Sequence, residues 1–556
     1  MNEQELIQLN NKITELKQQL NQFNKFENYN YEFIPNNNNK FNSNSALLIG
    51  EIKKINKEFE FIKNDWITFY DNGVAFYHAK KHQEAIECFN KVIQLNSNHL
   101  EAYFNKGISL SCLNRYQEAV QCYDKVIEID KNYSSAYNYK GLSLQKLIKH
   151  NEAIECFNKA IEIDSNLSSA QNNKGISLSS LNKFEEAIQC YDKAIEINQN
   201  YSEAYYNKGN ALQKLNKYEE ATCCYNKAIE INSNYSGAYL NKALSLYNLG
   251  KHEEAIPCFN KAIEINPKQL GAYINKGLNL QKLNKHEEAI QCYNIALKIN
   301  PNNSSVYLNK CFSLINLKND EEAIQCCNKA IEIDPNYIAY FNKGNILMNL
   351  NKFEEAIQCY DIVIQLNSNY TEAYFNKGNA LQKLKNHEEA IHYYTKTIQM
   401  NPNNLLAYLN KGNALVILER YEEAIECFNK VNEMSTNNFE AFFNKGNCLI
   451  NLSRHEEAIQ CFDKAIEIDS NNSELFCNKG NALYELNKNE EALQCYNKAL
   501  EINLNYSEAY CNKGITLINL NRYEEAIECF NKAIEINPNY TLAINNRSIV
   551  LNKKKF

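Results

Sequence analysis

The sequence predicts an all-α fold, an α-solenoid in which helix pairs stack one on the next. A segment of 34 residues recurs along most of the chain, and each copy carries two apolar stripes at helical spacing. The 556 residues also exceed the roughly 250–300 at which a single hydrophobic core stops growing. A repeat array avoids that limit, because each repeat packs only on its neighbours.

Three segments precede the repeats. Residues 1–26 carry Leu6, Leu9, Ile13 and Leu16 at coiled-coil spacing, which predicts a short amphipathic helix that either joins two copies weakly or stays alone. Residues 27–45 are rich in Asn and predict a linker. Residues 46–66 carry apolar side chains at helical spacing and predict a helix that caps the first repeat.

Fourteen full copies of the repeat span residues 67–541, and residues 542–556 form a partial copy with a basic tail. All full copies have 34 residues except one of 33, residues 305–337. In the copy at residues 203–236 the stripes are Tyr205, Gly209, Leu212 and Leu215 on the first helix, and Ala221, Cys224, Tyr225, Ala228 and Ile231 on the second. Asn216 and Lys217 form the predicted turn between them.

This pattern resembles the tetratricopeptide repeat (TPR) family over about 85% of the chain. The resemblance rests on the 34-residue period, the AYxNKG start, the EEAI start of the second helix and Asn-Pro-Asn at repeat ends. It implies a right-handed superhelix of about 14 repeats with a long inner groove that binds other proteins. One feature departs from the family: Lys precedes the glycine position in thirteen consecutive copies, where we expect its stem on apolar surface and its ammonium group in water.

No residue pattern points to catalysis, a metal or a cofactor. Thirteen of the 20 Cys share one frame position on the packed face of the second helix, where we expect free thiols that act as small hydrophobes. Six of the nine His share another position, at which other copies have Tyr or Phe. No phosphate-binding loop or nucleophile motif occurs. We therefore expect no enzyme activity.

Composition also limits the partners and the location. The net charge of −7 gives no basic excess for nucleic acid, and no apolar stretch is long enough to span a membrane. The N-terminus lacks the apolar core of a signal peptide. We expect a cytoplasmic protein whose partners are other proteins.

Asparagine forms a column on the first helices. On a helical wheel it lies opposite the apolar stripe, and it is present in thirteen of fifteen copies, whereas a content of 92 Asn in 556 residues predicts two or three by chance. The members proposed for binding are Asn207, Asn241, Asn275, Asn309, Asn342, Asn376, Asn410, Asn444, Asn478 and Asn512. A second Asn one turn later recurs in five consecutive copies, at Asn345, Asn379, Asn413, Asn447 and Asn481.

Two interpretations of this column stay open. A side-chain amide can bond both the C=O and the N–H of a peptide, so the column suits an extended segment of any sequence, with Phe341, Phe375 and Phe443 beside it for selectivity. It resembles the asparagine ladder in the TPR region of the O-GlcNAc transferase family, whose catalytic domain we do not expect after the last repeat. Alternatively, the amides bridge neighbouring helices or were inherited by copying one repeat.

The sequence thus favours a non-enzymatic scaffold that holds an extended peptide in the groove. The alternatives are a structural subunit of a larger assembly, and a regulatory or targeting subunit for an enzyme on another chain. A lysine and arginine clamp for a C-terminal carboxylate is absent from the matching places, which disfavours recognition of chaperone tails.

Overall fold

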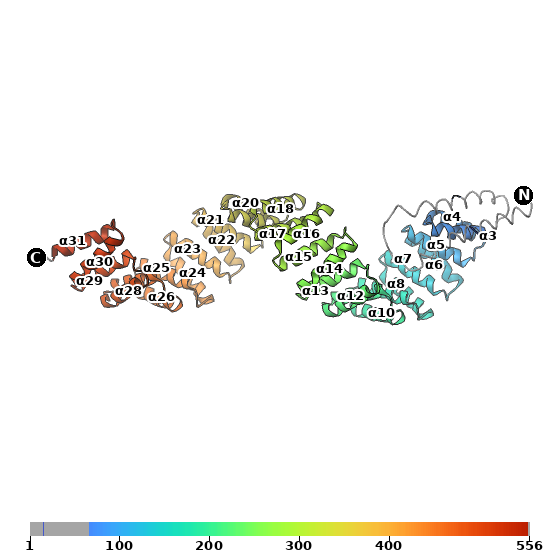
Figure 1. The fold of residues 1–556 in the computed structure, drawn as a ribbon, viewed down its shortest axis with the longest axis horizontal. Helices are drawn as coiled ribbons and strands as arrows, with labels where there is room; N and C mark the ends of the chain where they lie inside the picture. Colours follow the sequence, from blue (N-terminus) through green and yellow to red (C-terminus); the bar gives the residue numbers. More distant parts are fainter. Residues whose placement is uncertain (1–14, 16–49, 51–65, 554–556) are drawn as a thin grey trace, which may run out of the picture. The chain divides into compact units, whose positions relative to one another are not determined.

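The computed structural model describes residue 15, residue 50 and residues 66–553 (Figure 1). The predicted N-terminal helix, the linker and most of the predicted capping helix lie outside the described residues. Residues 66–553 form helices joined by short turns and contain no strand, as the sequence predicted. The chain divides into two units, residues 1–284 and residues 285–556.

The helices alternate between 13 residues for the first of each pair and 14 for the second. In the first unit they are α3 (Trp66–His78), α4 (His82–Leu95), α5 (Leu100–Cys112), α6 (Tyr116–Ile129), α7 (Ser134–Lys146), α8 (His150–Ile163), α9 (Ser168–Ser180), α10 (Phe184–Ile197), α11 (Ser202–Lys214), α12 (Tyr218–Ile231), α13 (Ser236–Asn248), α14 (His252–Ile265) and α15 (Leu270–Lys282). In the second unit they are α16 (His286–Ile299), α17 (Ser304–Asn316), α18 (Asp320–Ile333), α19 (Tyr337–Asn349), α20 (Phe353–Leu366), α21 (Thr371–Lys383), α22 (His387–Met400), α23 (Leu405–Ile417), α24 (Tyr421–Met434), α25 (Phe439–Asn451), α26 (His455–Ile468), α27 (Ser473–Glu485), α28 (Asn489–Ile502), α29 (Ser507–Asn519), α30 (Tyr523–Ile536) and α31 (Thr541–Lys553).

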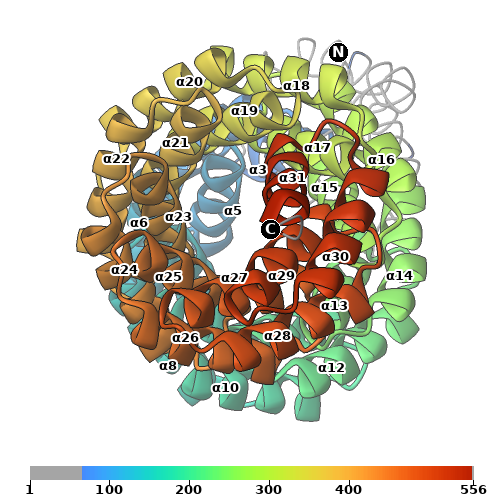
Figure 2. The same ribbon diagram turned by 90° about the vertical axis from the view of Figure 1, so that its left-hand side faces the viewer.

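Within each unit the pairs stack in chain order, so each is an α-solenoid. The first, odd-numbered helices lie on the inner side of the curved stack and the second, even-numbered helices on the outer side (Figure 2). No helix among residues 66–553 is long and apolar enough to cross a membrane.

The turn inside each pair needs a left-handed residue, and Asn often supplies it. Asn216 has φ of 58°, and the N–H groups of Asn216 and Lys217 bond back to the carbonyls of Gln213 and Leu212. Asn tolerates this conformation better than most residues. Ile148 adopts it too, with φ of 63° and a side chain that is 79% exposed, although a β-branched residue is strained there.

Asparagine also shapes the turn between repeats. In most copies an Asn or Asp side chain accepts the N–H two residues ahead, as Asn198 does from Asn200 at 3.0 Å. In some copies another Asn caps the next first helix, as Asn404 does by accepting the N–H of Ala407 at 3.0 Å. These turn and cap roles explain much of the high Asn content.

The glycine position and the buried ring are one packing unit. A Cβ added at Gly209 would lie 2.6 Å from a ring carbon of Tyr225, closer than such atoms approach. The same contact recurs at Gly412 with Phe428 and at most other copies, and the rings are fully buried. Glycine leaves room for the second-helix ring, and only the sixth repeat among these glycine–ring copies fits a larger residue, Ala243, beside its buried Phe259.

The lysine before that glycine pairs with acid in some copies. Lys377 is only 6% exposed, and its Nζ lies 2.6 Å from Asp361 Oδ1 of the preceding second helix. Lys140 and Lys208 pair in the same way with aspartates of the preceding repeat. An aspartate replaces the usual Asn on the second helix of these copies and pairs with the ammonium group. The expectation that the ammonium group reaches water is wrong for the buried Lys377, whereas Lys140 and Lys208 remain about a quarter exposed.

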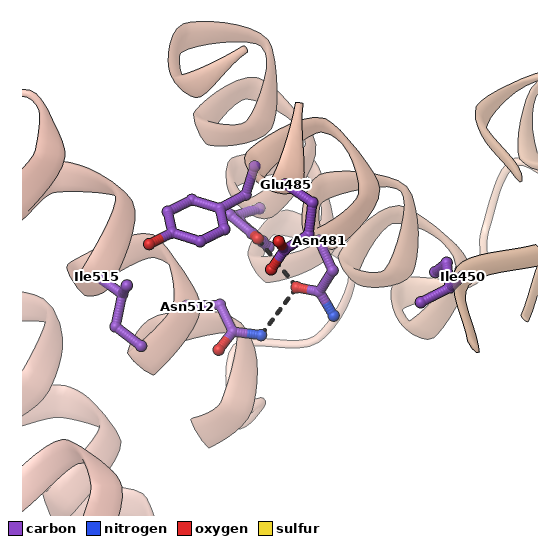
Figure 3. Close-up of a pocket in the computed structure, with 7 residues that line it drawn as sticks. Ile450, Asn481, Glu485, Asn512 and Ile515 are labelled. Atoms are coloured by element: carbon purple, nitrogen blue, oxygen red, sulfur yellow. Dashed lines mark hydrogen bonds between the residues drawn. The ribbon is translucent and has the colours of Figure 1, made fainter. Parts of the chain in front are cut away.

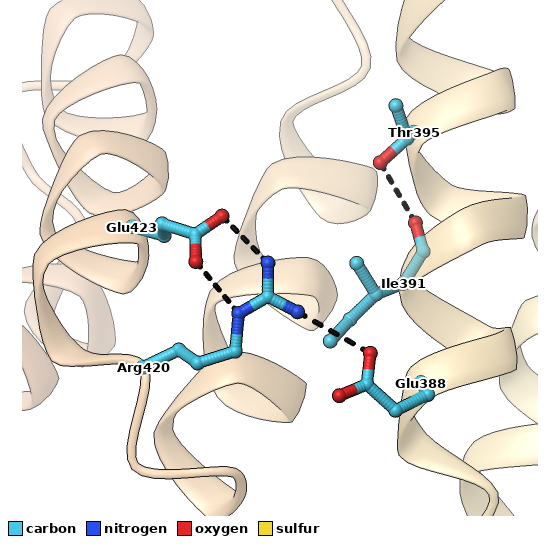
Figure 4. Close-up of polar contacts among 5 residues, drawn as sticks. All are labelled: Glu388, Ile391, Thr395, Arg420 and Glu423. Atoms are coloured by element: carbon cyan, nitrogen blue, oxygen red, sulfur yellow. Dashed lines mark hydrogen bonds and ion pairs between the residues drawn. The ribbon is translucent and has the colours of Figure 1, made fainter.

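Ion pairs at the outer turns also join neighbouring repeats. Arg420 binds Glu423 through Nε and Nη2 and reaches Glu388 of the preceding pair, with 3.3 Å between Arg420 Nη1 and Glu388 Oε2 (Figure 4). These groups are exposed, and exposed pairs contribute on the order of 0–1 kcal/mol. The buried rings, not these pairs, hold the stack together.

Candidate peptide-binding face

The inner face is the side of the first helices that carries the two asparagine columns. Asn376 and Asn379 of α21 are half-buried there, while Tyr374 and Leu381 of the same helix are buried. This division agrees with the helical wheel. The structure also buries Ala373 and Ala380 completely, so the packed side of the helix is wider than the predicted stripe.

The two columns bond to each other across repeats. Asn376 donates from Nδ2 to Oδ1 of Asn345, the second-column residue of the preceding copy, at 2.9 Å. The same bond recurs four times along the second unit, at 2.9–3.0 Å, from Asn410 to Asn379, Asn444 to Asn413, Asn478 to Asn447 and Asn512 to Asn481. The structure thus shows the bridging alternative for these residues, and their contact with a ligand stays a prediction.

A buried tyrosine hydroxyl completes several bridges. Tyr360 donates to Oδ1 of Asn345 at 2.8 Å, and Tyr496 donates to Oδ1 of Asn481 at 2.9 Å. The hydroxyl of Tyr394 has two acceptors within reach, Asn379 Oδ1 at 2.9 Å and Gln382 Oε1 at 2.5 Å. Burial raises the pKa of these phenols, so they stay protonated donors at neutral pH. The sequence analysis missed this role. Its signal was Tyr instead of Phe on the second helix of these copies.

The bridged amides keep unused hydrogen-bond donors or acceptors on the inner face. An amide has two N–H donors and one oxygen that accepts up to two bonds. Asn345 uses its oxygen twice, yet its Nδ2 donates to no residue in the described part of the chain. Asn376 likewise uses one N–H, and its oxygen accepts no bond from the described residues.

Asn342 interrupts the ladder of the second unit. The preceding copy has Phe312 instead of a second-column Asn, and Asn342 makes no side-chain hydrogen bond within residues 66–553. Its half-buried amide is therefore unbridged. Asn309 of α17 is half-buried on the same face.

The first unit is bridged less regularly. Asn241 donates to Asn210 at 2.8 Å and to the hydroxyl of Tyr206 at 3.1 Å. Asn207 donates to the buried Asn172 at 3.1 Å. Asn275 bonds within its own helix, to the carbonyl of Gly271 at 2.8 Å. The mixed partners follow from the loss of the second-column Asn in most of these copies.

The three aromatic candidates lie on the first helices and pack against the rings of the second helices. The ring centroid of Phe341 lies 6.1 Å from that of Tyr360, Phe375 lies 6.0 Å from Tyr394, and Phe443 lies 6.3 Å from Phe462. All three are half-buried. Phe341 also meets the ring of Tyr370 at 4.9 Å, and Phe443 stacks on Phe439 at 5.7 Å between centroids, so only part of each ring is exposed.

A pocket of about 330 Å³ opens beside one bridge near the end of the second unit (Figure 3). The Asn481–Asn512 pair and Tyr496 line it, together with Ile450, Ile515, Tyr484 and Glu485. It combines apolar surface, an oriented amide pair and one carboxylate. Such a mixture suits a side chain with an apolar stem and a polar end.

The inner face of the second unit carries more acidic than basic side chains, with Lys383 of α21 as an exposed base. Its first helices carry exposed glutamates that form no ion pair with Lys or Arg anywhere in residues 66–553: Glu372, Glu440, Glu474, Glu485 and Glu508. One of these glutamates lies directly beside the asparagines, because Nδ2 of Asn413 donates to Glu440 at 2.9 Å. The charges of Glu508 and Glu474, after burial, raise the pKa of Tyr506.

The described residues hold no group of three or more His, Cys, Asp or Glu that could bind a metal ion. The thiol positions are mostly buried, and burial raises the pKa of Cys427 to about 11, so these thiols stay protonated. The structure gives them the packing role that the sequence predicted.

Family comparisons identify repeats along nearly the whole described chain. One tetratricopeptide repeat model matches residues 100–133, 202–235, 236–269, 271–303, 304–337, 371–404, 439–472 and 507–540. Related repeat models match residues 72–99, 134–167, 175–216, 344–385, 393–426, 461–494 and 480–520. No curated protein matches the sequence.

Solved structures similar to the chain are also helical-repeat proteins. YrrB, described as a TPR protein with an unusual peptide-binding site, is 26% identical, with 34% of this chain and 99% of that one covered and a TM-score of 0.32. Cut9 in complex with Hcn1, from the APC/C, is 17% identical over 91% of this chain and all of that one, with a TM-score of 0.33. Yeast Tom70 is 17% identical over 76% and 97%, with a TM-score of 0.29.

Proposed function

Because the chain belongs to the tetratricopeptide repeat family, whose members serve as protein-interaction scaffolds, we propose that it is a non-enzymatic scaffold that holds an extended peptide segment on its inner face. The observation that carries the proposal is the row of bridged amides in the second unit. Each bridge fixes an Asn side chain in one orientation while leaving N–H donors or an oxygen unused.

Bridging makes these amides better ligands for a peptide. A free Asn loses side-chain entropy when it binds, and this cost weakens association. An Asn already held by its neighbour in the next repeat has lost much of that freedom on folding. A row of such groups, one set per repeat, can bond successive carbonyls and N–H groups of an extended backbone without reading its sequence.

The exposed glutamates on the inner face favour a partner segment with lysine or arginine. Unpaired carboxylates on one face attract basic chains and repel acidic ones. The pocket beside Glu485 offers apolar walls for the stem of such a side chain. Binding should therefore weaken as salt rises, because the charges are exposed.

One set of substitutions separates ligand binding from bridging. Asn345→Asp, Asn379→Asp and Asn447→Asp keep an oxygen for the bridge but replace the outward N–H donors. We would select a binding peptide for the full chain from a random displayed library. Its Kd should weaken about ten- to a thousandfold in the triple variant if three bonds of roughly 0.5–1.5 kcal/mol are lost.

The controls for this experiment are stability and charge. The melting temperature of the triple variant should not fall, since a carboxylate accepts the bridging bonds at least as well as an amide. A triple glutamate-to-glutamine change at exposed positions of the second helices, away from the inner face, restores the net charge of the Asp variant. Unchanged affinity in the Asp variant would reject the amides as a peptide site.

A structural subunit that binds no linear segment is the second candidate. The bridges themselves favour it, because stabilising the stack is sufficient reason for the columns to exist. Under this alternative, selected peptides would bind outside the inner face and would be insensitive to the three Asp changes.

A further inference from the structure

The eighth repeat replaces both members of the usual glycine–ring pair by cysteine. Cys311 stands in α17 at the glycine position, and Cys327 stands in α18 at the ring position. In most other copies a glycine there leaves room for the buried ring, and the sixth repeat fits Ala243 beside Phe259. Here the smaller Cys327 leaves that space, and the side chain of Cys311 occupies it.

The two sulfurs meet in the interior of the repeat. Their Sγ atoms lie 3.1 Å apart, and neither side chain is exposed. They come from the two helices of one pair and stand 16 residues apart, a spacing that neither a CxxC motif nor the 34-residue repeat period reveals.

We propose that Cys311 and Cys327 form a redox-sensitive dithiol that an oxidant converts into a disulfide joining α17 to α18. The reacting atoms are already neighbours, and side-chain rotation must bring them only about 1 Å closer to reach a bond of about 2.05 Å. The adjacent Cys326 makes no hydrogen bond with Cys311, so the register of α18 places Cys327 as the partner.

The reaction with hydrogen peroxide balances without another reagent. One thiolate attacks a peroxide oxygen, the O–O bond breaks, and a sulfenic acid and hydroxide form. The second thiol then attacks that sulfur, the S–S bond forms, and the oxygen leaves as water. Two thiols and one peroxide give one disulfide and two waters, so the sulfurs are oxidised and the peroxide oxygens reduced.

Burial sets the rate of this reaction. The hydrogen bond with Cys327 and burial raise the pKa of Cys311, so little thiolate exists in the closed repeat. Oxidation therefore requires α17 and α18 to separate locally, and the disulfide then prevents the next opening. The eighth repeat is suited to this, because it lacks the buried ring present in neighbouring copies.

The test uses the full chain with the exposed Cys112 and Cys223 changed to serine, which removes the most accessible competing thiols. The protein is oxidised with hydrogen peroxide in its native state and, separately, during refolding from urea in a glutathione redox buffer. Trypsin cleaves after Lys310, Lys318 and Lys329, so the disulfide would link residues 311–318 to residues 319–329 in a peptide found by mass spectrometry without reductant.

Two single variants assign the bond. Cys326→Ser should leave the linked peptide, whereas Cys327→Ser should abolish it. In the oxidised protein the amide exchange of α17 and α18 should slow by up to about tenfold, because a short closed loop restricts the open state. Reduction with dithiothreitol should restore the original exchange rates.

A third variant shows whether the effect depends on the dithiol. The double change Cys311→Gly and Cys327→Tyr restores the usual pair, and oxidant should leave its exchange rates unchanged. Absence of the linked peptide under both native and refolding conditions, or its persistence in Cys327→Ser, would overturn the proposal.

Discussion

Removing bridging amides should loosen the stack where they join it. We predict that Asn376→Ala, Asn410→Ala and Asn444→Ala each destabilise the contact with the preceding repeat. Each change deletes one neutral hydrogen bond of 2.9 Å, with a net value of about 0.5–1.5 kcal/mol. The acceptor oxygens are half-buried and gain water in exchange, so the lower part of that range applies, and the triple variant should lose about 1.5–3 kcal/mol in bonds.

Helix propensity acts in the opposite direction and needs its own control. Ala stabilises a helix interior over Asn by up to about 0.7 kcal/mol. Asn342→Ala gains this helix propensity and loses no hydrogen bond, because Asn342 has no hydrogen-bond partner within residues 66–553. The difference between Asn376→Ala and Asn342→Ala therefore isolates the bridge.

The assay must be local, because a repeat array does not unfold in one step. Amide exchange followed by mass spectrometry on α19–α25 gives the opening free energy of each helix. We expect slower exchange in α19 of Asn342→Ala and little change in α21 of Asn376→Ala, because in the second variant the lost bond offsets the gain in helix propensity. If both variants shift alike, the bridges do not stabilise the stack and the reasoning fails.

Three further predictions concern single positions. Gly412→Ala should destabilise by about 1–3 kcal/mol, seen as a lower urea midpoint, because its Cβ would lie 2.7 Å from the Phe428 ring; no change would mean that the ring moves freely. Ile148→Gly should stabilise by about 1 kcal/mol by relieving a left-handed β-branched residue, and a lower melting temperature would contradict this. Burial lowers the pKa of His82, so the unfolded chain binds more protons and stability should fall as pH drops below about 6.5, a dependence that His82→Tyr should flatten in melting curves from pH 7.5 to 5.5.

The repeating helix pairs were predictable because their signals are local. Apolar spacing, the acidic start of the second helix and the Asn turn lie within one 34-residue copy, and fourteen copies repeat the evidence. The packing role of cysteine followed for the same reason, since its frame position lies beside the buried ring. Even the 33-residue copy kept both helices, because its shortening falls in the turn before Tyr337.

The lateral bonds between copies were not predictable from a helical wheel. A helical wheel places Asn376 away from the core of its own helix pair. It describes one helix only, so it cannot show the contact with Asn345, which lies 31 residues earlier in another helix. Lys377 was misjudged in the same way, because its partner Asp361 belongs to the preceding repeat. The contact between Cys311 and Cys327 could be predicted only by comparing the glycine position and the ring position of the same repeat. Each cysteine alone looks like an ordinary variation between copies.

Bridging and ligand binding are compatible uses of one asparagine. The bond between neighbouring copies uses one N–H of the donor and the oxygen of the acceptor, and the other amide groups stay available on these half-buried side chains. A residue kept for stacking therefore also supplies oriented polar groups at every repeat. The spacing of these groups is then set by the stack, so a partner backbone of regular extension would meet one set after another. The row of bridged amides ends at the unbridged Asn342, so the length of a bound segment should be limited by the uninterrupted run of bridges from Asn376 to Asn512.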